Sequence, residues 1–172
     1  MGKVIKLQIC SKDSATKHPS NCSGKSEKDS PVPLKEKRRS HYIQVDSIEC
    51  IAEVGIAGDD NAKGGDRQVT LIDEAVNRWI ASQPEKGLCS SRFKANITTS
   101  GMGTTLLQQG ALLSIGEAVL EISSVNKKCY GQWCKLYSKE SSCPIPKGCY
   151  FAKVARSGEV KTGDVWVIEN VV

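Results

Sequence analysis

Short runs in which apolar and polar residues alternate recur along most of this chain, and turn-forming residues separate them. Alternation with a period of two is typical of β-strands that bury one face. The runs lie at Gly2–Ile9, His41–Ile51, Gln68–Ile72, Leu112–Ile115, Ala118–Ile122, Tyr150–Ala155 and Val165–Ile168. Many short strands at this spacing favour a mainly β fold, and we predict a closed or nearly closed β-barrel.

One stretch departs from this alternation and predicts a helix. Asp73 can cap a helix that extends to Ala81, because its carboxylate can accept hydrogen bonds from the exposed N–H groups of the first turn. The apolar residues of the stretch fall on one face at helical spacing, at Ala75, Val76, Trp79 and Ile80. We therefore expect the barrel to carry one or a few short helices.

The chain has 172 residues, a length that suits one domain, and we assign residues 1–172 to a single domain. A long polar stretch without periodicity covers about residues 11–39. We expect this stretch to be a mobile loop. Gly55–Gly65 is rich in glycine, aspartate and asparagine, and we expect a second, turn-rich loop there.

The net charge of +5 is mildly basic, and much of the excess lies in the cluster Lys35, Lys37, Arg38 and Arg39. No aromatic platform or recognition helix accompanies this cluster, so we expect a solvated loop and no nucleic-acid partner. The chain has no apolar stretch long enough for a membrane span or a secretory signal. We therefore expect no membrane association and a cytoplasmic location.

The eight cysteines make up a smaller share of the chain than in disulfide scaffolds. In a reducing compartment the thiols should be free, metal-bound or catalytic. Cys129, Cys134 and Cys143 lack a Cys-x-x-Cys pair, so the common zinc patterns are absent, but Cys134 and Cys143 are still candidate metal ligands beside Cys129. Alternatively, several cysteines pack in the core as small hydrophobic side chains.

Cys129 is the strongest candidate for chemistry. A thiol reacts as its thiolate, and positive charge nearby favours that form. Lys127 and Lys128 directly precede Cys129, although alternate residues of a strand point to opposite faces, so both need not reach the sulfur.

Two other segments could bind an anionic ligand. Gly64-Gly65-Asp66-Arg67 combines a tight turn with a guanidinium suited to phosphate or carboxylate, or it is a structural turn with an Asp–Arg pair. The segment Phe93–Gly101 contains Asn96 and Thr98, which could bind a ligand or hold a loop through side-chain to backbone hydrogen bonds.

Taken in order, these motifs resemble the MOSC family, named after the C-terminal domain of molybdenum-cofactor sulfurase. The resemblance is closest to small stand-alone bacterial members, and it covers nearly all the chain except about residues 21–39. The motifs that carry it are Gly58-Asp59, Gly64–Val69, Phe93–Gly101, Ile115–Ile122, Lys127–Cys129 and Val160–Asp164. The fold that the resemblance implies is a β-barrel similar to the small barrel domain of pyruvate kinase.

The resemblance implies a role in sulfur chemistry of the molybdenum cofactor. Family members are thought to receive sulfur on a cysteine as a persulfide and to pass it to a metal–sulfur centre, and Cys129 holds the matching position. Lys128 and Arg67 would then hold the phosphate of the pterin or favour the thiolate, and Asn96 and Thr98 would shape the pocket.

The partners implied are a cysteine desulfurase as sulfur donor and a molybdoenzyme or cofactor-biosynthesis protein as acceptor. Whether the chain has sulfurtransferase activity of its own is open. We expect no pyridoxal phosphate, because the cofactor sulfurases bind it on a separate domain. Two alternatives remain: a module that binds molybdopterin without transferring sulfur, and a metal site at the cysteines.

Overall fold

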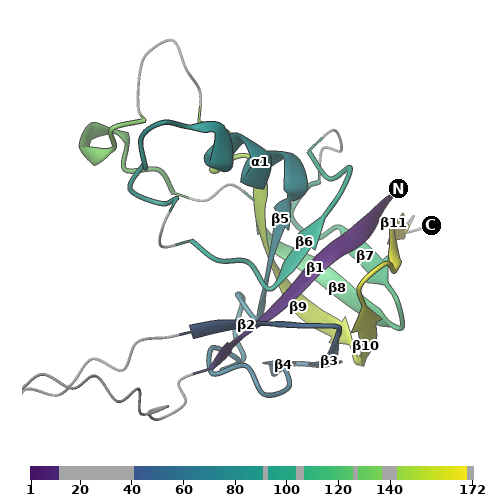
Figure 1. Cartoon of the computed structure of the whole chain (residues 1–172). Helices are drawn as coiled ribbons and strands as arrows, with labels where there is room; N and C mark the ends of the chain where they lie inside the picture. Colours follow the sequence, from purple (N-terminus) through teal and green to yellow (C-terminus); the bar gives the residue numbers. More distant parts are fainter. Residues whose placement is uncertain (12–40, 91–92, 104–106, 126–127, 137–142, 170–172) are drawn as a thin grey trace, which may run out of the picture.

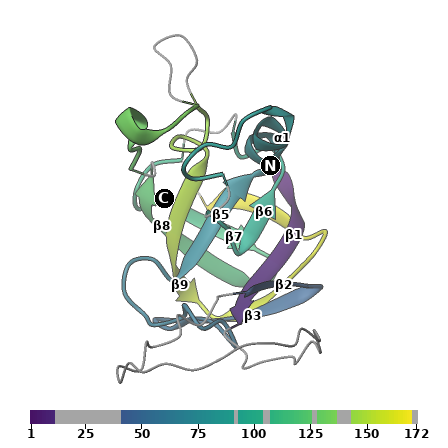
Figure 2. The ribbon, with the colours of Figure 1, turned by 60° about the vertical axis from the view of Figure 1, so that its left-hand side comes forward.

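The computed structural model describes residues 1–11, 41–90, 93–103, 107–125, 128–136 and 143–169. The prediction of a mainly β fold with a closed barrel is confirmed, since one large sheet closes on itself (Figures 1 and 2). Seven strands form the barrel in the order β11-β7-β8-β9-β5-β6-β1, and β2 continues the sheet beyond β1. These strands are β1 (Gly2–Ser11), β2 (His41–Val45), β5 (Val69–Asp73), β6 (Ile97–Thr99), β7 (Leu112–Ile115), β8 (Ala118–Val125), β9 (Cys149–Arg156) and β11 (Val165–Glu169).

Pairing between β1 and β11 closes the barrel. Gly2 lies opposite Trp166, whose indole Nε1 donates a hydrogen bond of 3.0 Å to the carbonyl oxygen of Ser100. A Cβ atom on Gly2 would come within 1.8 Å of that same oxygen. The seam therefore requires a residue without a side chain at position 2.

A second sheet of three strands lies at the end of the barrel opposite α1 (Figures 1 and 2). It contains β3 (Ser47–Ile51), β4 (Gly55–Ile56) and β10 (Gly158–Lys161). The predicted alternating run at His41–Ile51 is thus two strands, β2 and β3, that belong to different sheets. The expectation of a loop at Gly55–Gly65 needs correction at its start, because Gly55 and Ile56 pair with β3.

The helix α1 (Glu74–Ser82) is the one α-helix of the described residues, and its predicted cap is confirmed. Asp73 Oδ1 accepts a hydrogen bond of 2.7 Å from the backbone N of Ala75. The helix lies in the crossover between β5 and β6, which are parallel and therefore cannot be joined by a hairpin. Val76 is the residue of α1 that is buried, whereas Ala75 of the predicted apolar face is exposed.

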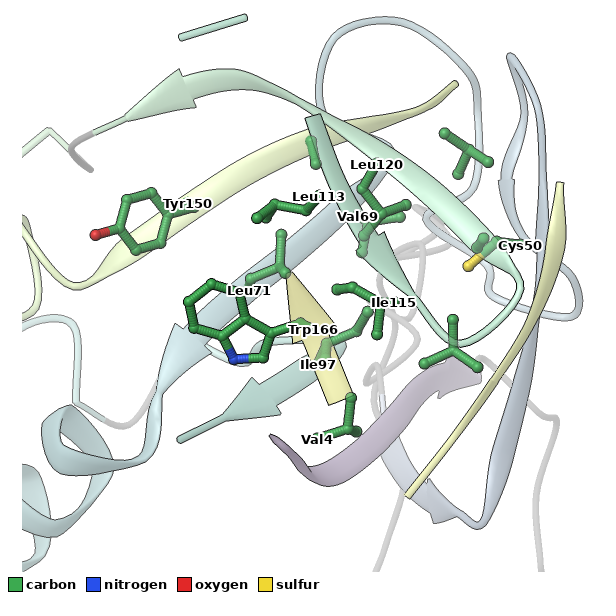
Figure 3. Close-up of a cluster of buried hydrophobic side chains, with 14 of the residues drawn as sticks. Val4, Cys50, Val69, Leu71, Ile97, Leu113, Ile115, Leu120, Tyr150 and Trp166 are labelled. Atoms are coloured by element: carbon green, nitrogen blue, oxygen red, sulfur yellow. The ribbon is translucent and has the colours of Figure 1, made fainter. Parts of the chain in front are cut away.

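The main core fills the barrel with aliphatic side chains from almost every strand and with Trp166 (Figure 3). A smaller core packs α1 against the outside of the barrel, and its buried members are Ile72, Val76, Ala95, Ile145 and Cys149. Two members of this second cluster, Ile145 and Cys149, flank the chain segment that leads into β9.

The predicted mobile loop at residues 11–39 lies outside the described residues except for Ser11, which ends β1. No helix of the described residues is long and apolar enough to cross a membrane.

Candidate functional site

Four cysteines line one small pocket at the end of the barrel where α1 lies. Cys129 follows β8, Cys134 follows the 3₁₀ turn η1 (Gly131–Trp133), Cys143 precedes β9, and Cys89 follows α1 in the chain. We call this space the thiol pocket. Its other lining residues are mostly apolar: Gly87, Leu88, Lys128, Tyr130, Leu136, Ile145 and Pro146.

Cys129 is the exposed thiol of this pocket, and Lys128 lines it too. The Nζ atom of Lys128 lies 5.3 Å from the centre of the Tyr130 ring, a cation–π contact that holds the ammonium beside the pocket. Lys127 lies outside the described residues. Lys128 and Cys129 thus line the same pocket.

Cys143 is partly buried deeper in the same pocket. Burial raises the pKa of its thiol, a hydrogen bond with the backbone of Ile145 opposes this shift, and negative charge on the other three thiols raises the pKa further. Among those three the charge of Cys129 has the largest effect on the pKa of Cys143. Cys134 is held differently, because its Sγ accepts a hydrogen bond of 3.4 Å from the backbone N of Leu88.

The space inside the thiol pocket is about 20 Å³. A volume of this size holds about one water-sized group. The pocket is therefore far too small for a pterin, but it can accommodate one added atom on a thiol.

Three other cysteines belong to the core, as the alternative interpretation predicted. Cys10, Cys50 and Cys149 are fully buried. Burial raises the pKa of the Cys50 thiol to about 12, so it stays protonated and unreactive at neutral pH.

The prediction that Cys134 and Cys143 bind metal stays a prediction. Within the described ranges, no group of three or more His, Cys, Asp or Glu side chains is arranged to hold a metal ion.

A larger cleft lies on the other side of the segment that contains Cys143. It has a volume of about 560 Å³, and we call it the helix cleft because α1 forms one wall. Arg78 and Lys147 bring exposed positive charge to it, and Asp73 lies at its base, where Oδ2 accepts a hydrogen bond of 2.7 Å from the N of Gly103. Residues 143–148 separate the two spaces, since Cys143, Ile145 and Pro146 line the thiol pocket and Pro144, Lys147 and Gly148 line the helix cleft.

Asn96 lies in neither space. Its side chain is buried, and both hydrogens of Nδ2 are used, one to Asp59 Oδ2 at 2.7 Å and one to the carbonyl oxygen of Gln8 at 3.3 Å. Its Oδ1 accepts from the N of Thr70 at 3.0 Å. These bonds join β1, β5 and the loop that contains Asp59, which is the structural alternative considered for this residue.

Arg67 also lies away from both spaces. The guanidinium stacks 4.4 Å from the centre of the Phe151 ring on β9. Gly64 and Gly65 adopt positive φ angles of 69° and 78°, so the segment is a tight turn, and Asp66 pairs with Lys153 at 3.8 Å. Thr98, on β6, lines a third groove beside α1 together with Lys6 and Lys94.

A family model for the MOSC domain matches residues 58–167, which is well over half of the chain. The chain belongs to the MOSC family. Among curated proteins, none matches it. The matched region of this MOSC protein includes the complete lining of the thiol pocket.

Solved structures share the fold at low sequence identity. The YUAD protein from Bacillus subtilis is 20% identical with a TM-score of 0.57, over 96% of this chain and 93% of that one. YiiM from Escherichia coli is 21% identical with a TM-score of 0.50, over 76% of this chain and 66% of that one. A protein described as hypothetical is 22% identical with a TM-score of 0.51, over 76% and 64%. This MOSC chain thus spans slightly less than two thirds of the length of two of these relatives.

Sequence reasoning about this MOSC protein missed Cys89 and the helix cleft. Cys89 lies far from the other pocket cysteines in the chain, and no spacing rule connects it to them. Lys147 and Arg78 likewise come from separate segments that approach only in the folded barrel. The one available signal was the number of cysteines, which does not indicate which of them meet.

Proposed function

We propose that this protein is a sulfur carrier of molybdenum-cofactor metabolism, which accepts sulfur on Cys129 as a persulfide and delivers it to a metal–sulfur centre. One observation carries the proposal: the exposed Cys129 opens into an apolar pocket lined by three further thiols. Membership of the MOSC family supplies the link to molybdenum-cofactor sulfurase.

The surroundings of Cys129 suit a carrier in two ways. An exposed thiol can be reached by a donor protein, whereas the buried thiols of the core cannot. Lys128 lines the same pocket, and a cation that approached the sulfur would favour the thiolate that attacks a donor persulfide.

Access by a partner is also favoured by the surface next to Cys129. Tyr130 and Trp133 are exposed by 49% and 71%, and both lie within four residues of Cys129. Exposed aromatic side chains are enriched where proteins bind one another. A cysteine desulfurase as donor and a molybdoenzyme or biosynthetic protein as acceptor would dock over this surface.

The test is mass spectrometry after incubation with a cysteine desulfurase and cysteine. The wild-type protein should gain the mass of one sulfur atom on the peptide that contains Cys129, and Cys129→Ser should gain none. Cys134→Ser is the matched control, because it removes a thiol from the same pocket and should still be loaded. If Cys129 gains no sulfur while the desulfurase is active, the carrier proposal is wrong.

A second candidate function, binding of the molybdenum cofactor itself, is favoured by the helix cleft. Its volume of about 560 Å³ falls within the range of small-molecule sites, and Arg78 and Lys147 could hold the anionic phosphate of a pterin. Residues present at the cleft therefore fit the cofactor, which would supply the metal–sulfur centre.

Binding of purified molybdopterin separates this candidate from the carrier. Lys147→Ala should weaken binding about tenfold, because it removes a charge-assisted contact. Arg67→Ala is the comparison, since Arg67 stacks on Phe151 outside the cleft. A loss of affinity in Arg67→Ala but not in Lys147→Ala would place the cofactor elsewhere, as the sequence alone predicted.

A further inference from the structure

We propose that Cys143 is a resolving thiol, which displaces the outer sulfur of a persulfide on Cys129 as hydrosulfide and leaves a Cys129–Cys143 disulfide. This inference rests on the proposed function, because it describes how the sulfur held on Cys129 is released. It gives a role to a second thiol of the pocket that the carrier step does not use.

The geometry that supports this step is the shared pocket. Cys129 and Cys143 both line a space of about 20 Å³, and the charge of Cys129 acts on Cys143 more strongly than that of Cys134 or Cys89. Among the described residues, Cys129 precedes η1 and Cys143 precedes β9, and neither lies within a helix or strand. Cys134 is less suited, because its sulfur already accepts a hydrogen bond from Leu88 N.

Cys143 is also suited to react after Cys129, because its thiol is mostly protonated at rest. Burial keeps its thiol mostly protonated, since the pKa is raised, while the backbone of Ile145 stabilises the thiolate once it forms. An exposed Cys129 would therefore be loaded first from outside, and the partly buried Cys143 would react second, from within the pocket.

The reaction balances without an added oxidant. The Cys143 thiolate attacks Sγ of Cys129, a Sγ–Sγ bond forms, and the bond between Cys129 Sγ and the outer sulfur breaks. The outer sulfur leaves with the bonding electron pair and takes up the proton that Cys143 released. It is thereby reduced to hydrosulfide, and the Cys143 sulfur is oxidised, while Cys129 Sγ keeps the oxidation level that it already had in the persulfide. A dithiol reductant would then restore both thiols.

Attack on the inner sulfur is favoured by the leaving group. Hydrosulfide is a weaker base than a cysteine thiolate, and thiol exchange is faster when the departing sulfur is the weaker base.

The experiment loads Cys129 in two ways, with a cysteine desulfurase plus cysteine and with inorganic polysulfide. After removal of excess reagent, hydrosulfide is measured over time without added thiol, and peptides are mapped by mass spectrometry. Wild-type protein should release hydrosulfide together with formation of a Cys129–Cys143 disulfide. Cys143→Ser should load normally but release hydrosulfide at least about tenfold more slowly.

Cys134→Ser is the matched control, because serine can still accept the hydrogen bond from Leu88 N, and it should release hydrosulfide at the wild-type rate. Equal release by Cys143→Ser and wild type would overturn the inference, as would transfer of the sulfur atom onto Cys143 without a disulfide. Loading of Cys129 by polysulfide but not by the desulfurase would contradict the proposed function. In that case the rate of hydrosulfide release from the polysulfide-loaded protein would still test whether Cys143 is the resolving thiol. If Cys129 takes up sulfur from neither reagent, both proposals are wrong.

Discussion

The side chain of Asn96 makes three hydrogen bonds within the protein, to Asp59, Gln8 and Thr70. Asp59 in turn accepts from the backbone N of Cys10 and of Asn61, so the buried carboxylate depends on Asn96 for one of its donors. The asparagine side chain therefore stabilises the crossing of β1, β5 and the loop that contains Asp59, and aspartate could not replace it because it lacks the two N–H donors. A ligand-binding role for Asn96 would have to compete with these bonds.

Replacement of Asn96 should reduce stability. Asn96→Ala leaves Asp59 Oδ2 without its side-chain donor in a buried site, and we expect a loss of about 2–3 kcal/mol in the free energy of unfolding. Urea denaturation followed by circular dichroism measures the loss. Asn77→Ala, on the exposed side of α1, is the control and should change stability by less than about 0.5 kcal/mol. Comparable stability of Asn96→Ala and wild type would show that the network is dispensable.

At the scale of the elements, α1 packs closely on the segment that leads into β9. A Cβ atom on Gly148 would lie 2.3 Å from Cγ2 of Val76, which is the buried residue of the helix. The same segment separates the thiol pocket from the helix cleft, so the fit between Val76 and Gly148 positions both spaces.

Gly148→Ala should displace α1 and cost about 1–3 kcal/mol, because the added methyl group overlaps the Val76 side chain. Val76→Ala removes the overlapping atom, so the double variant should be more stable than the sum of the two single losses implies, by at least about 1 kcal/mol. Denaturation of all four proteins gives this coupling energy. Strictly additive losses would mean that the helix and the segment do not meet as described.

At the scale of the whole molecule, stability depends on closing one sheet into a barrel. Closure removes the two free edges that an open sheet of these strands would expose. The barrel closes at the short ladder between β1 and β11, where Gly2 pairs with Trp166 and lies close to the Ser100 carbonyl oxygen.

Gly2→Val should open this seam, because no side chain fits between position 2 and the Ser100 oxygen. We expect a loss of about 2–3 kcal/mol and faster hydrogen exchange at the amides of β11 than at those of β8 and β9. Lys3→Val is the control on the same strand, since Lys3 is exposed and valine suits a strand. Uniform exchange along all strands of Gly2→Val would argue against a local seam.

Sequence reasoning reached the barrel because the strand signal is local. Alternation of apolar and polar residues needs only neighbouring positions, and most of the strands followed from it, whereas β6 (Ile97–Thr99) was not predicted as a strand. The Asp73 cap followed from a local signal of another kind, the capping side chain itself. The short strand at Gly55–Ile56 was missed because two residues carry no periodicity, and its pairing with β3 is set by distant parts of the chain.

For the candidate site as well, some features followed from local sequence signals and others depended on the tertiary structure. The sequence by itself determined the family and the barrel, because these rest on ordered motifs along the chain, and it singled out Cys129 as the candidate for chemistry, which stays a prediction. Only the tertiary structure decided that Cys89, Cys134 and Cys143 join Cys129 in one pocket, while Asn96 and Arg67 turn to other partners. Barrel closure brings segments together that are far apart in sequence. Polar side chains that could by their chemistry bind a ligand then form hydrogen bonds or packing contacts within the protein instead.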